Sequence, residues 1–384
     1  MEEFAGWLGC TSRHLRRVFT AEYNVSPVQY LQTCRLLLAK NLLTDTNLSV
    51  LDVAMAAGFG SLRRFNDLFK NHYHLSPTAL RKRMPEEKKQ RAEITLSLGY
   101  RPPYRYDEIV RFLAGRAIPG VETVQNNEYL RTVCLLNADK KPVYGWIRIG
   151  HAPKKNTLTI TLSEALLPVL PQVLAKVRHL FDLDCDPEAV YETLAPMNNI
   201  RPGLCVFGTR LPGCFNAFEM AFRAVLGQQI TVKAASTLAG RLVEAFGTPV
   251  KTDVEGLTHI FPSPQKVLAL GETIENHLGP LGIIATRART IYELAKVFEC
   301  GQIEFDIPTD PEAEIKKLLT IPGIGAWTAQ YIAMRTMEWT DAFLETDAGI
   351  RKALELYSAK ELLKLAEAWQ PWRSYATINL WNSL

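Results

Sequence analysis

The sequence lacks three features that would assign it to a common class of protein. No apolar run approaches the roughly 18 residues that a membrane-spanning helix needs, and the N-terminus has no basic-then-apolar layout of a signal peptide. The seven cysteines are scattered singly, without a CxxC pair or a histidine placed to complete a zinc site. We therefore expect a cytoplasmic protein with reduced thiols and no bound metal.

Length and charge suggest several domains and one basic end. At 384 residues the chain is longer than a single core usually supports, which favours two or three domains. The formal net charge of +4 is low for a nucleic-acid binder, but residues 1–90 hold 13 Lys and Arg against 8 Asp and Glu, or +5, which leaves −1 for the rest. Electrostatic attraction to phosphate is therefore concentrated at the N-terminus.

The N-terminal segment contains an internal repeat. The stretch RRVFTAEYNVSP (16–27) matches NDLFKNHYHLSP (66–77) in its phenylalanine, tyrosine and Ser-Pro positions. Each copy follows a short apolar helix and a glycine turn, FAGWLGCTS (4–12) and VAMAAGFGS (53–61). This order of helix, glycine turn and helix predicts two helix-turn-helix units.

In such a unit the second helix enters the major groove. The candidate DNA contacts are basic residues at the start of each second helix, namely Arg13, Arg16, Arg17, Arg63 and Arg64. Alternatively, they form solvated faces of a small helical domain. The tandem units resemble the DNA-binding domain of AraC-type transcription regulators over residues 1–84, which implies promoter DNA as a partner. That family has a helix before the first unit, so we expect this domain to be incomplete at its start.

The rest of the chain predicts a linker and two further domains. The charged stretch 85–93 reads as a solvated linker. Residues 94–205 are expected to form an α+β domain with an antiparallel sheet, a scaffold without an active-site cluster. Its expected strands are 94–100, 129–136, 143–150 and 157–163, and its expected helices are about 106–117 and 164–182. Residues 206–384 show helical periodicity broken at glycine and proline, which predicts an all-α domain and completes a multidomain α and α+β fold.

A glycine-rich connection in the third domain predicts a phosphate site. The segment LLTIPGIGAWTAQYIAMR (318–335) joins two helices, and the glycines allow a tight turn that leaves the amides of the second helix facing outward. A DNA phosphate can bind there, helped by the helix dipole. Taken alone, this pattern fits an ordinary helix connection equally well. The candidate DNA-binding residues are Pro322, Gly323, Ile324, Gly325 and Thr328.

Downstream of this hairpin lies FLETDAGI (343–350), in which Asp347 precedes a new apolar helix. Aspartate is a common helix N-cap, and a helix N-terminus favours an ionised carboxylate. Together the two motifs resemble the helix-hairpin-helix family of base-excision DNA glycosylases, and most closely its 3-methyladenine glycosylase II group. The resemblance extends over about residues 94–384 and includes the separated segments 100–122, 201–230 and 369–381.

The resemblance implies roles for individual residues. Asp347 corresponds to the catalytic carboxylate, and Trp327, Tyr331 and Trp381 correspond to the aromatic walls of the pocket for a flipped base. Trp327 and Tyr331 are four residues apart and share one helix face. Without the resemblance, aromatic residues at this spacing would indicate side chains of the hydrophobic core.

The resemblance also implies a wedge residue, which fills the gap left by the flipped nucleotide. In the segment LGQQI (226–230), Gln229 falls at the position of this wedge, and its neighbour Gln228 is an equal candidate.

The resemblance also implies a monofunctional enzyme without a cofactor. The lyase branch of the family places a lysine where Trp327 stands, and its iron–sulfur cluster requires cysteines that do not occur beyond Cys300. The expected partner is duplex DNA containing alkylated bases, bound by a monomer. The alternative is an alkylation-response regulator whose glycosylase-like part is only structural. Such fusions usually carry a methyl-accepting zinc domain, which this sequence lacks.

Overall fold

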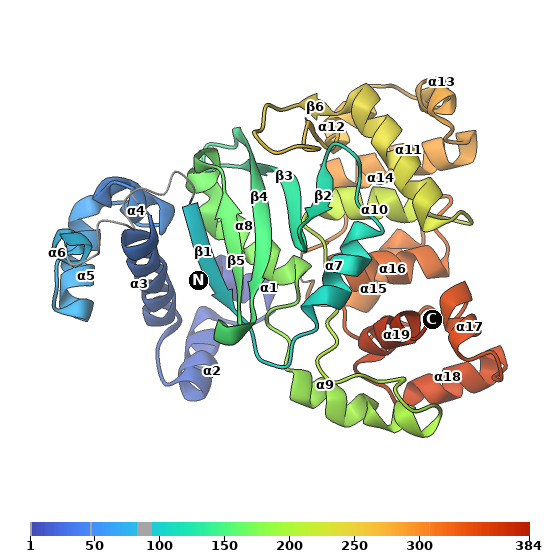
Figure 1. Cartoon of the computed structure of the whole chain (residues 1–384), viewed down its shortest axis with the longest axis horizontal. Coiled ribbons are helices and arrows are strands. Elements are labelled where there is room, and N and C mark those ends of the chain that lie inside the picture. The colour runs from blue at the N-terminus through green and yellow to red at the C-terminus, as the bar shows by residue number, and fades with distance from the viewer. Residues whose placement is uncertain (1, 47, 83–93, 307) are drawn as a thin grey trace. The chain divides into compact units, whose positions relative to one another are not determined.

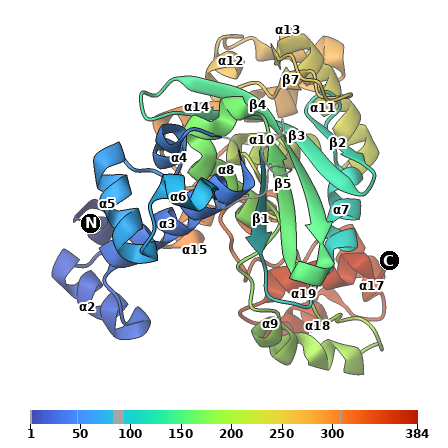
Figure 2. The same ribbon diagram turned by 60° about the vertical axis from the view of Figure 1, so that its left-hand side comes forward.

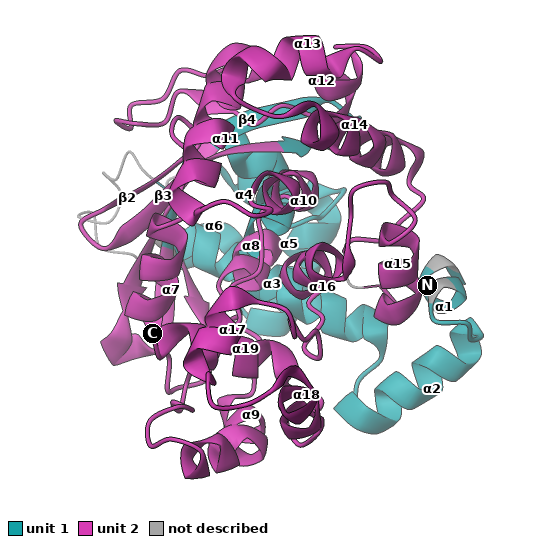
Figure 3. Ribbon diagram, turned by 90° about the vertical axis from the view of Figure 1, so that its right-hand side faces the viewer, with its two compact units in different colours: residues 1–96, 135–145, 160–174 teal, residues 97–134, 146–159, 175–384 magenta. Residues whose placement is uncertain are grey.

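The computed structural model describes residues 2–46, 48–82, 94–306 and 308–384 (Figure 1). The chain divides into two compact units, one of residues 1–96, 135–145 and 160–174, and one of residues 97–134, 146–159 and 175–384 (Figure 3). Within the described ranges, no helix is both long enough and apolar enough to cross a membrane. The expected linker, 85–93, lies outside the described residues.

The N-terminal residues are helical, as the repeat predicts. Their helices are α1 (Glu2–Trp7), α2 (Ser12–Tyr23), α3 (Pro27–Asp45), α4 (Val50–Ala56), α5 (Leu62–Tyr73) and α6 (Pro77–Lys82). The conserved spacing of the repeat has a local cause, because each Ser-Pro pair starts a helix. The hydroxyls of Ser26 and Ser76 accept from the backbone amides of Gln29 and Ala79, and proline is favoured at the first helical position.

The two expected recognition helices, α2 and α5, begin in the same way. Thr11 caps α2 and Ser61 caps α5. All five candidate arginines of these helices are exposed, which leaves their guanidinium groups available to DNA.

The middle of the chain forms one five-stranded sheet in the order β1-β5-β4-β3-β2, visible in Figure 1 and Figure 2. The strands are β1 (Ile94–Gly99), β2 (Glu122–Gln125), β3 (Glu128–Leu136), β4 (Pro142–Ala152) and β5 (Thr157–Leu162). The predicted fold class is confirmed, and so are the four predicted strands. The short β2, antiparallel to β3, was not predicted.

The two helices expected in this region differ from prediction in detail. The first, α7 (Tyr106–Ala114), ends three residues early. The second is a 3₁₀ segment, Glu164–Val169, followed by α8 (Leu170–Leu180). Pro168 explains the tighter start, because proline donates no backbone hydrogen bond and is tolerated best near a helix end.

The remaining chain is almost entirely helical. The helices are α9 (Pro187–Leu194), α10 (Ala217–Leu226), α11 (Val232–Phe246), α12 (Pro264–Leu268), α13 (Ile274–Leu278), α14 (Ala285–Cys300), α15 (Pro311–Leu318), α16 (Ala326–Thr336), α17 (Ala348–Ala353), α18 (Ala359–Glu367) and α19 (Arg373–Asn382). Short strands β6 (Thr248–Pro249) and β7 (His259–Ile260) pair with each other. Helix α10 packs against α14 and α16, and α17 contacts α19. Much of α10, α16 and α19 is buried, so these helices form the core of the domain.

Asp182 connects the turn after α8 to α19, the helix that carries Trp381. Its carboxyl accepts a hydrogen bond from the amide of Leu211 (2.8 Å) and from the Tyr375 hydroxyl (2.9 Å to the nearer oxygen). Burial raises the pKa of this carboxyl to about 7, although the two donors and the charge of Arg210 oppose the shift.

A raised carboxyl pKa makes stability depend on pH. Between about pH 4 and 7 the native state holds a proton that the unfolded state releases, so the free energy of unfolding falls as pH rises through this window. We expect the stability advantage of wild type over Asp182→Asn to shrink by about 1–3 kcal/mol between pH 5 and pH 8. Urea denaturation at the two pH values measures it. The control variant is Asp139→Asn, because Asp139 is exposed. If the stability difference between wild type and Asp182→Asn is the same at both pH values, the raised pKa is contradicted.

Candidate active site

Asp347 is the N-cap of α17, and three N–H groups converge on its carboxylate. One oxygen accepts from the Ile350 amide (3.0 Å) and from the Trp381 indole (2.8 Å). The other oxygen accepts from the Trp327 indole (3.1 Å). All three neighbours donate, so the arrangement suits an ionised carboxylate and fixes its orientation.

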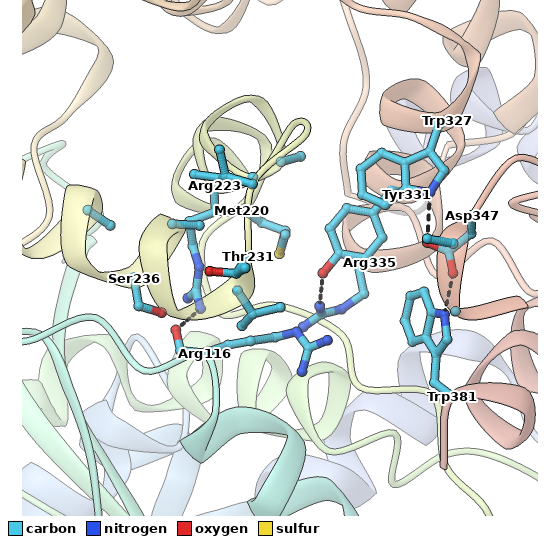
Figure 4. Close-up of a pocket in the computed structure, with 18 of the residues that line it drawn as sticks. Arg116, Met220, Arg223, Thr231, Ser236, Trp327, Tyr331, Arg335, Asp347 and Trp381 are labelled. Carbon is cyan, nitrogen blue, oxygen red and sulfur yellow. Dashed lines mark hydrogen bonds between the residues drawn. The ribbon is translucent and has the colours of Figure 1, made fainter. Parts of the chain in front are cut away.

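The aromatic residues expected from the sequence lie together beside Asp347 (Figure 4). The rings of Trp327 and Tyr331 stack at 5.0 Å and 21°, and Tyr331 meets Trp381 at 6.2 Å and 62°. They line a pocket of about 430 Å³, within the size range of small-molecule sites and large enough for one nucleobase.

Gly349 lets Trp381 reach the carboxylate. A Cβ atom at this position would lie 2.9 Å from Cδ1 of Trp381 and 3.0 Å from an oxygen of Asp347, closer than such atoms normally approach. Sequence reasoning did not select this residue. Its signal was a glycine two positions after the candidate aspartate, in the first turn of a helix where glycine is otherwise unfavourable.

Sequence reasoning also missed the floor of the pocket, which contains Arg116, Arg223 and Arg335. Arg335 donates from Nη1 to the Tyr331 hydroxyl (2.9 Å). Burial raises the pKa of Tyr331, but the positive charges of the three arginines outweigh burial and hold this pKa below its ordinary value. One signal was available, because Arg335 follows Tyr331 by four residues and so shares its helix face.

The hairpin between α15 and α16 has the backbone that the glycines predicted. Gly323 has φ of 88°, and a Cβ atom there would lie 2.0 Å from the Thr290 hydroxyl, which donates to the Pro322 carbonyl (2.9 Å). Gly325 is the N-cap of α16 and offers no side chain to its first-turn amides. An anion such as a DNA phosphate is the natural partner for that helix end.

Two of the candidate hairpin residues are turned inward. Ile324 and Thr328 are only 5% and 3% exposed, so neither residue presents its side chain to DNA in this conformation. Pro322, Gly323 and Gly325 are exposed.

The two glutamines between α10 and α11 have different environments in the structure. Gln228 donates from Nε2 to the Gly323 carbonyl (2.9 Å) and to the Thr328 hydroxyl (3.0 Å). Gln229 is exposed, with φ of 55°. Both line a groove of about 880 Å³ that also contains Trp327 and Asp347. The hairpin, the glutamines and the carboxylate therefore share one surface.

Three family models match the chain in succession. A helix-turn-helix domain matches residues 4–83, the AlkA N-terminal domain matches residues 95–216, and the HhH-GPD superfamily of base excision DNA repair proteins matches residues 222–369.

Known proteins show the same organisation. A probable bifunctional transcriptional activator/DNA repair enzyme AlkA of Mycobacterium tuberculosis is 36% identical over 99% of this chain and 76% of its own length. DNA-3-methyladenine glycosylase 2 of Escherichia coli is 36% identical over 74% of this chain and 96% of its own length. The solved 3-methyladenine DNA glycosylase of Archaeoglobus fulgidus shares the fold, with a TM-score of 0.58 at 20% identity over 74% of this chain and 97% of that one. The chain therefore belongs to the DNA-3-methyladenine glycosylase 2 family of helix-hairpin-helix base-excision repair enzymes, and carries an additional AraC-type helix-turn-helix domain.

Proposed function

We propose that this DNA glycosylase hydrolyses the N-glycosidic bond of alkylated bases of the 3-methyladenine type in duplex DNA and does not cleave the strand. The observation that carries the proposal is the Asp347 carboxylate, held by two indole N–H groups at the edge of an aromatic pocket of nucleobase size. DNA as the substrate also fits the cytoplasmic location expected from the sequence.

Binding begins with the sugar-phosphate backbone. The first-turn amides of α16, at Gly325 and beyond, would hold a phosphate beside the damaged nucleotide. The damaged base must leave the stack before its glycosidic bond can be reached. Gln229 is the proposed wedge, because it is exposed on the shared groove while the side chain of Gln228 is bonded to the hairpin.

The aromatic pocket then receives the base. Alkylation of a ring nitrogen gives the purine a positive charge, which adds a cation–π attraction of about 0.5–2 kcal/mol on an indole face. The same charge makes the base a better leaving group. When the bond between C1′ and the base nitrogen breaks, its electron pair leaves with the base, and Asp347 stabilises the positive charge that develops on the sugar. Water then adds at C1′. No side-chain amine is needed, and Trp327 occupies the position of the lyase lysine.

Base release tests this proposal. Duplex carrying one 3-methyladenine or 7-methylguanine should lose the base when the protein is added, and its strand should break only after alkali treatment. Strand cleavage without alkali would contradict a monofunctional enzyme. Specific duplex binding without base release would support the regulator instead.

We further propose that the chain divides at the boundaries expected from the sequence, and that residues 1–84 bind promoter DNA. The family matches at residues 4–83, 95–216 and 222–369 support both proposals. The exposed arginines of α2 and α5 support the second, because each can neutralise a phosphate.

Those arginines make duplex binding depend on salt. Each phosphate contact contributes a slope of about −0.9 to log affinity plotted against log salt. We expect replacement of Arg16, Arg17, Arg63 and Arg64 by glutamine to flatten this slope by about 1 to 3, while the excision rate at saturating enzyme stays unchanged. Fluorescence anisotropy at several salt concentrations measures the slope.

The matched control removes the same charge from the middle domain. Exposed lysines at positions 140, 141, 154 and 155 are replaced by glutamine, and the slope should change little. Equal flattening by both sets would show a general charge effect, and an unchanged slope in the arginine variant would show that α2 and α5 do not contact DNA.

A further inference from the structure

His179 connects the middle domain to the C-terminal end of helix α16. It lies in the last turn of α8, and its side chain is only 15% exposed. Its Nε2 atom lies 3.1 Å from the carbonyl oxygen of Arg335, in the last turn of α16. Its Nδ1 atom lies 2.8 Å from a carboxylate oxygen of Glu338. The reaction described above gives neither contact a role.

These two contacts require a doubly protonated ring. Carbonyl and carboxylate oxygens only accept hydrogen bonds, whereas a neutral imidazole has a single N–H group. Only the imidazolium can donate to both oxygens at once. Burial lowers the pKa of His179, but hydrogen bonds with Cys214 and Glu338 outweigh burial and raise this pKa to about 10. The ring therefore carries a positive charge at neutral pH.

A positive charge stabilises this end of α16. The last carbonyl groups of a helix have no partner within the helix, and the helix dipole places partial negative charge there. Glu338 follows the helix with φ of 53°, a left-handed conformation that glycine usually adopts at a helix end. A glutamate is unfavourable in this conformation, but it supplies the carboxylate that pairs with His179.

A glycine allows His179 and Arg335 to lie close together. A Cβ atom at Gly213 would lie 2.7 Å from Nε2 of His179, closer than such atoms normally approach. The Gly213 carbonyl also accepts from Nη2 of Arg335 (2.8 Å). Arg335 is therefore held at two points, by its own carbonyl at His179 and by its guanidinium at Gly213.

Arg335 connects this anchor to the active site. Its guanidinium donates to the Tyr331 hydroxyl, and the Tyr331 ring stacks on Trp327 (Figure 4). The Trp327 indole in turn donates to Asp347. A shift of the C-terminal end of α16 would therefore displace the aromatic wall and one of the donors that orient the carboxylate.

We propose that His179, as an imidazolium, is a positioning residue of the glycosylase reaction, and that Glu338 keeps it in place. Together they fix the C-terminal end of α16, so that Tyr331 and Trp327 hold the geometry in which Asp347 faces the sugar. His179 is outside the lining of the base pocket and acts only through α16. The inference rests on the proposed function, because the positioned residues belong to that site.

The first experiment measures single-turnover excision of 7-methylguanine at saturating enzyme, and binding to duplex with an abasic site. His179→Gln removes the charge but keeps a polar donor, and should slow excision about tenfold or more with little change in binding. His179→Lys restores a cation with donors for both oxygens, so its excision rate should stay within about threefold of wild type. The control is His277→Gln, at an exposed histidine in the last turn of α13, which should leave excision unchanged.

The second experiment uses Glu338→Gly to separate positioning from folding. Glycine adopts φ of 53° without strain, so the free energy of unfolding should stay close to that of wild type. Loss of the carboxylate lowers the pKa of His179, and the ring then releases its proton at a lower pH than in wild type. The excision rate of the variant relative to wild type should therefore fall about threefold or more from about pH 6 to about pH 9. Lys140→Gly is the control, because Lys140 is exposed and has φ of 59°, and its relative rate should not change with pH.

Nitrogen NMR of the ring assigns this titration to His179. The charged or titratable groups around the ring are Glu338 and Arg335 at the end of α16, Cys214 before α10, and Asp182 in the turn after α8. Asp182 also responds to the loss of Glu338, because the charge of that carboxylate raises its pKa. Both ring nitrogens of wild-type His179 should give the signals of an imidazolium at pH 7, and those of Glu338→Gly should titrate together with the excision rate.

Each other result contradicts a definite statement. If His179→Lys is as slow as His179→Gln, or if wild-type His179 is neutral at pH 7, the inference is wrong. If His179→Gln unfolds, Glu338→Gly decides, because a relative rate that stays constant with pH excludes positioning by the imidazolium. If wild type releases no alkylated base, the proposed function fails, whereas the NMR signals still test the charge of His179.

Discussion

Asp347→Asn is expected to reduce single-turnover base release at least a thousandfold, while binding to duplex with an abasic site changes little. The substitution keeps the shape of the side chain but removes the charge that faces the developing oxocarbenium ion. A thousandfold corresponds to about 4 kcal/mol, the size of effect expected from one preorganised electrostatic group. The amide also places an N–H opposite one of the three donors that now reach the carboxylate, which disturbs the indole positions further.

Release of 3-methyladenine measures the rate of base release, and a gel-shift assay measures binding to duplex with an abasic site. Glu345→Gln provides the control, because Glu345 is an exposed carboxylate in the same segment. Retention of more than about a tenth of the wild-type rate by Asp347→Asn would be incompatible with a catalytic role for this residue.

Trp327→Ala is expected to slow excision about a hundredfold and to leave affinity for undamaged duplex nearly unchanged. The indole forms one wall of the pocket and donates to Asp347, and both functions act only after the base has left the stack. Trp327→Phe separates the two functions, since it keeps an aromatic wall and loses the N–H. The excision rate is measured on duplex containing 7-methylguanine, and the affinity is measured with undamaged duplex.

The companion variant Gly323→Val should show the opposite pattern. Valine cannot adopt φ of 88° without strain and would collide with Thr290, so the hairpin should distort and bind every duplex less tightly.

Equal losses of excision and of undamaged-duplex binding in Trp327→Ala would assign Trp327 to packing instead.

The resemblance to the glycosylase family supplied the candidate site, and local patterns in the sequence predicted parts of its geometry. The spacing of Trp327 and Tyr331 predicted a shared face, and the structure stacks the two rings. The position of Asp347 before an apolar helix predicted an N-cap, and the structure shows one. These features depend on residues within about one helical turn, so a single sequence contains the information.

The parts that were missed depend on residues distant in the sequence. Arg116 lies in the middle segment, which was interpreted as a scaffold, and nothing in its neighbourhood shows that it reaches a pocket built mainly from α10, α11 and α16. The choice between Gln228 and Gln229 likewise needed the position of the Gly323 carbonyl. Strand β2 was missed because four residues are too few to show an alternating pattern.

The hydrogen bonds of Gln228 have a mechanical consequence. Its side chain is bonded to Gly323 and Thr328, and its own carbonyl accepts from Arg287. The loop that would contact the base stack and the hairpin that would bind the backbone are thus joined by two side-chain hydrogen bonds. A movement of the loop against the base stack would therefore be transmitted through these hydrogen bonds to the hairpin. Weakly stacked or damaged base pairs open most easily. This coupling would therefore favour insertion of the loop at damaged pairs, before any base reaches the pocket.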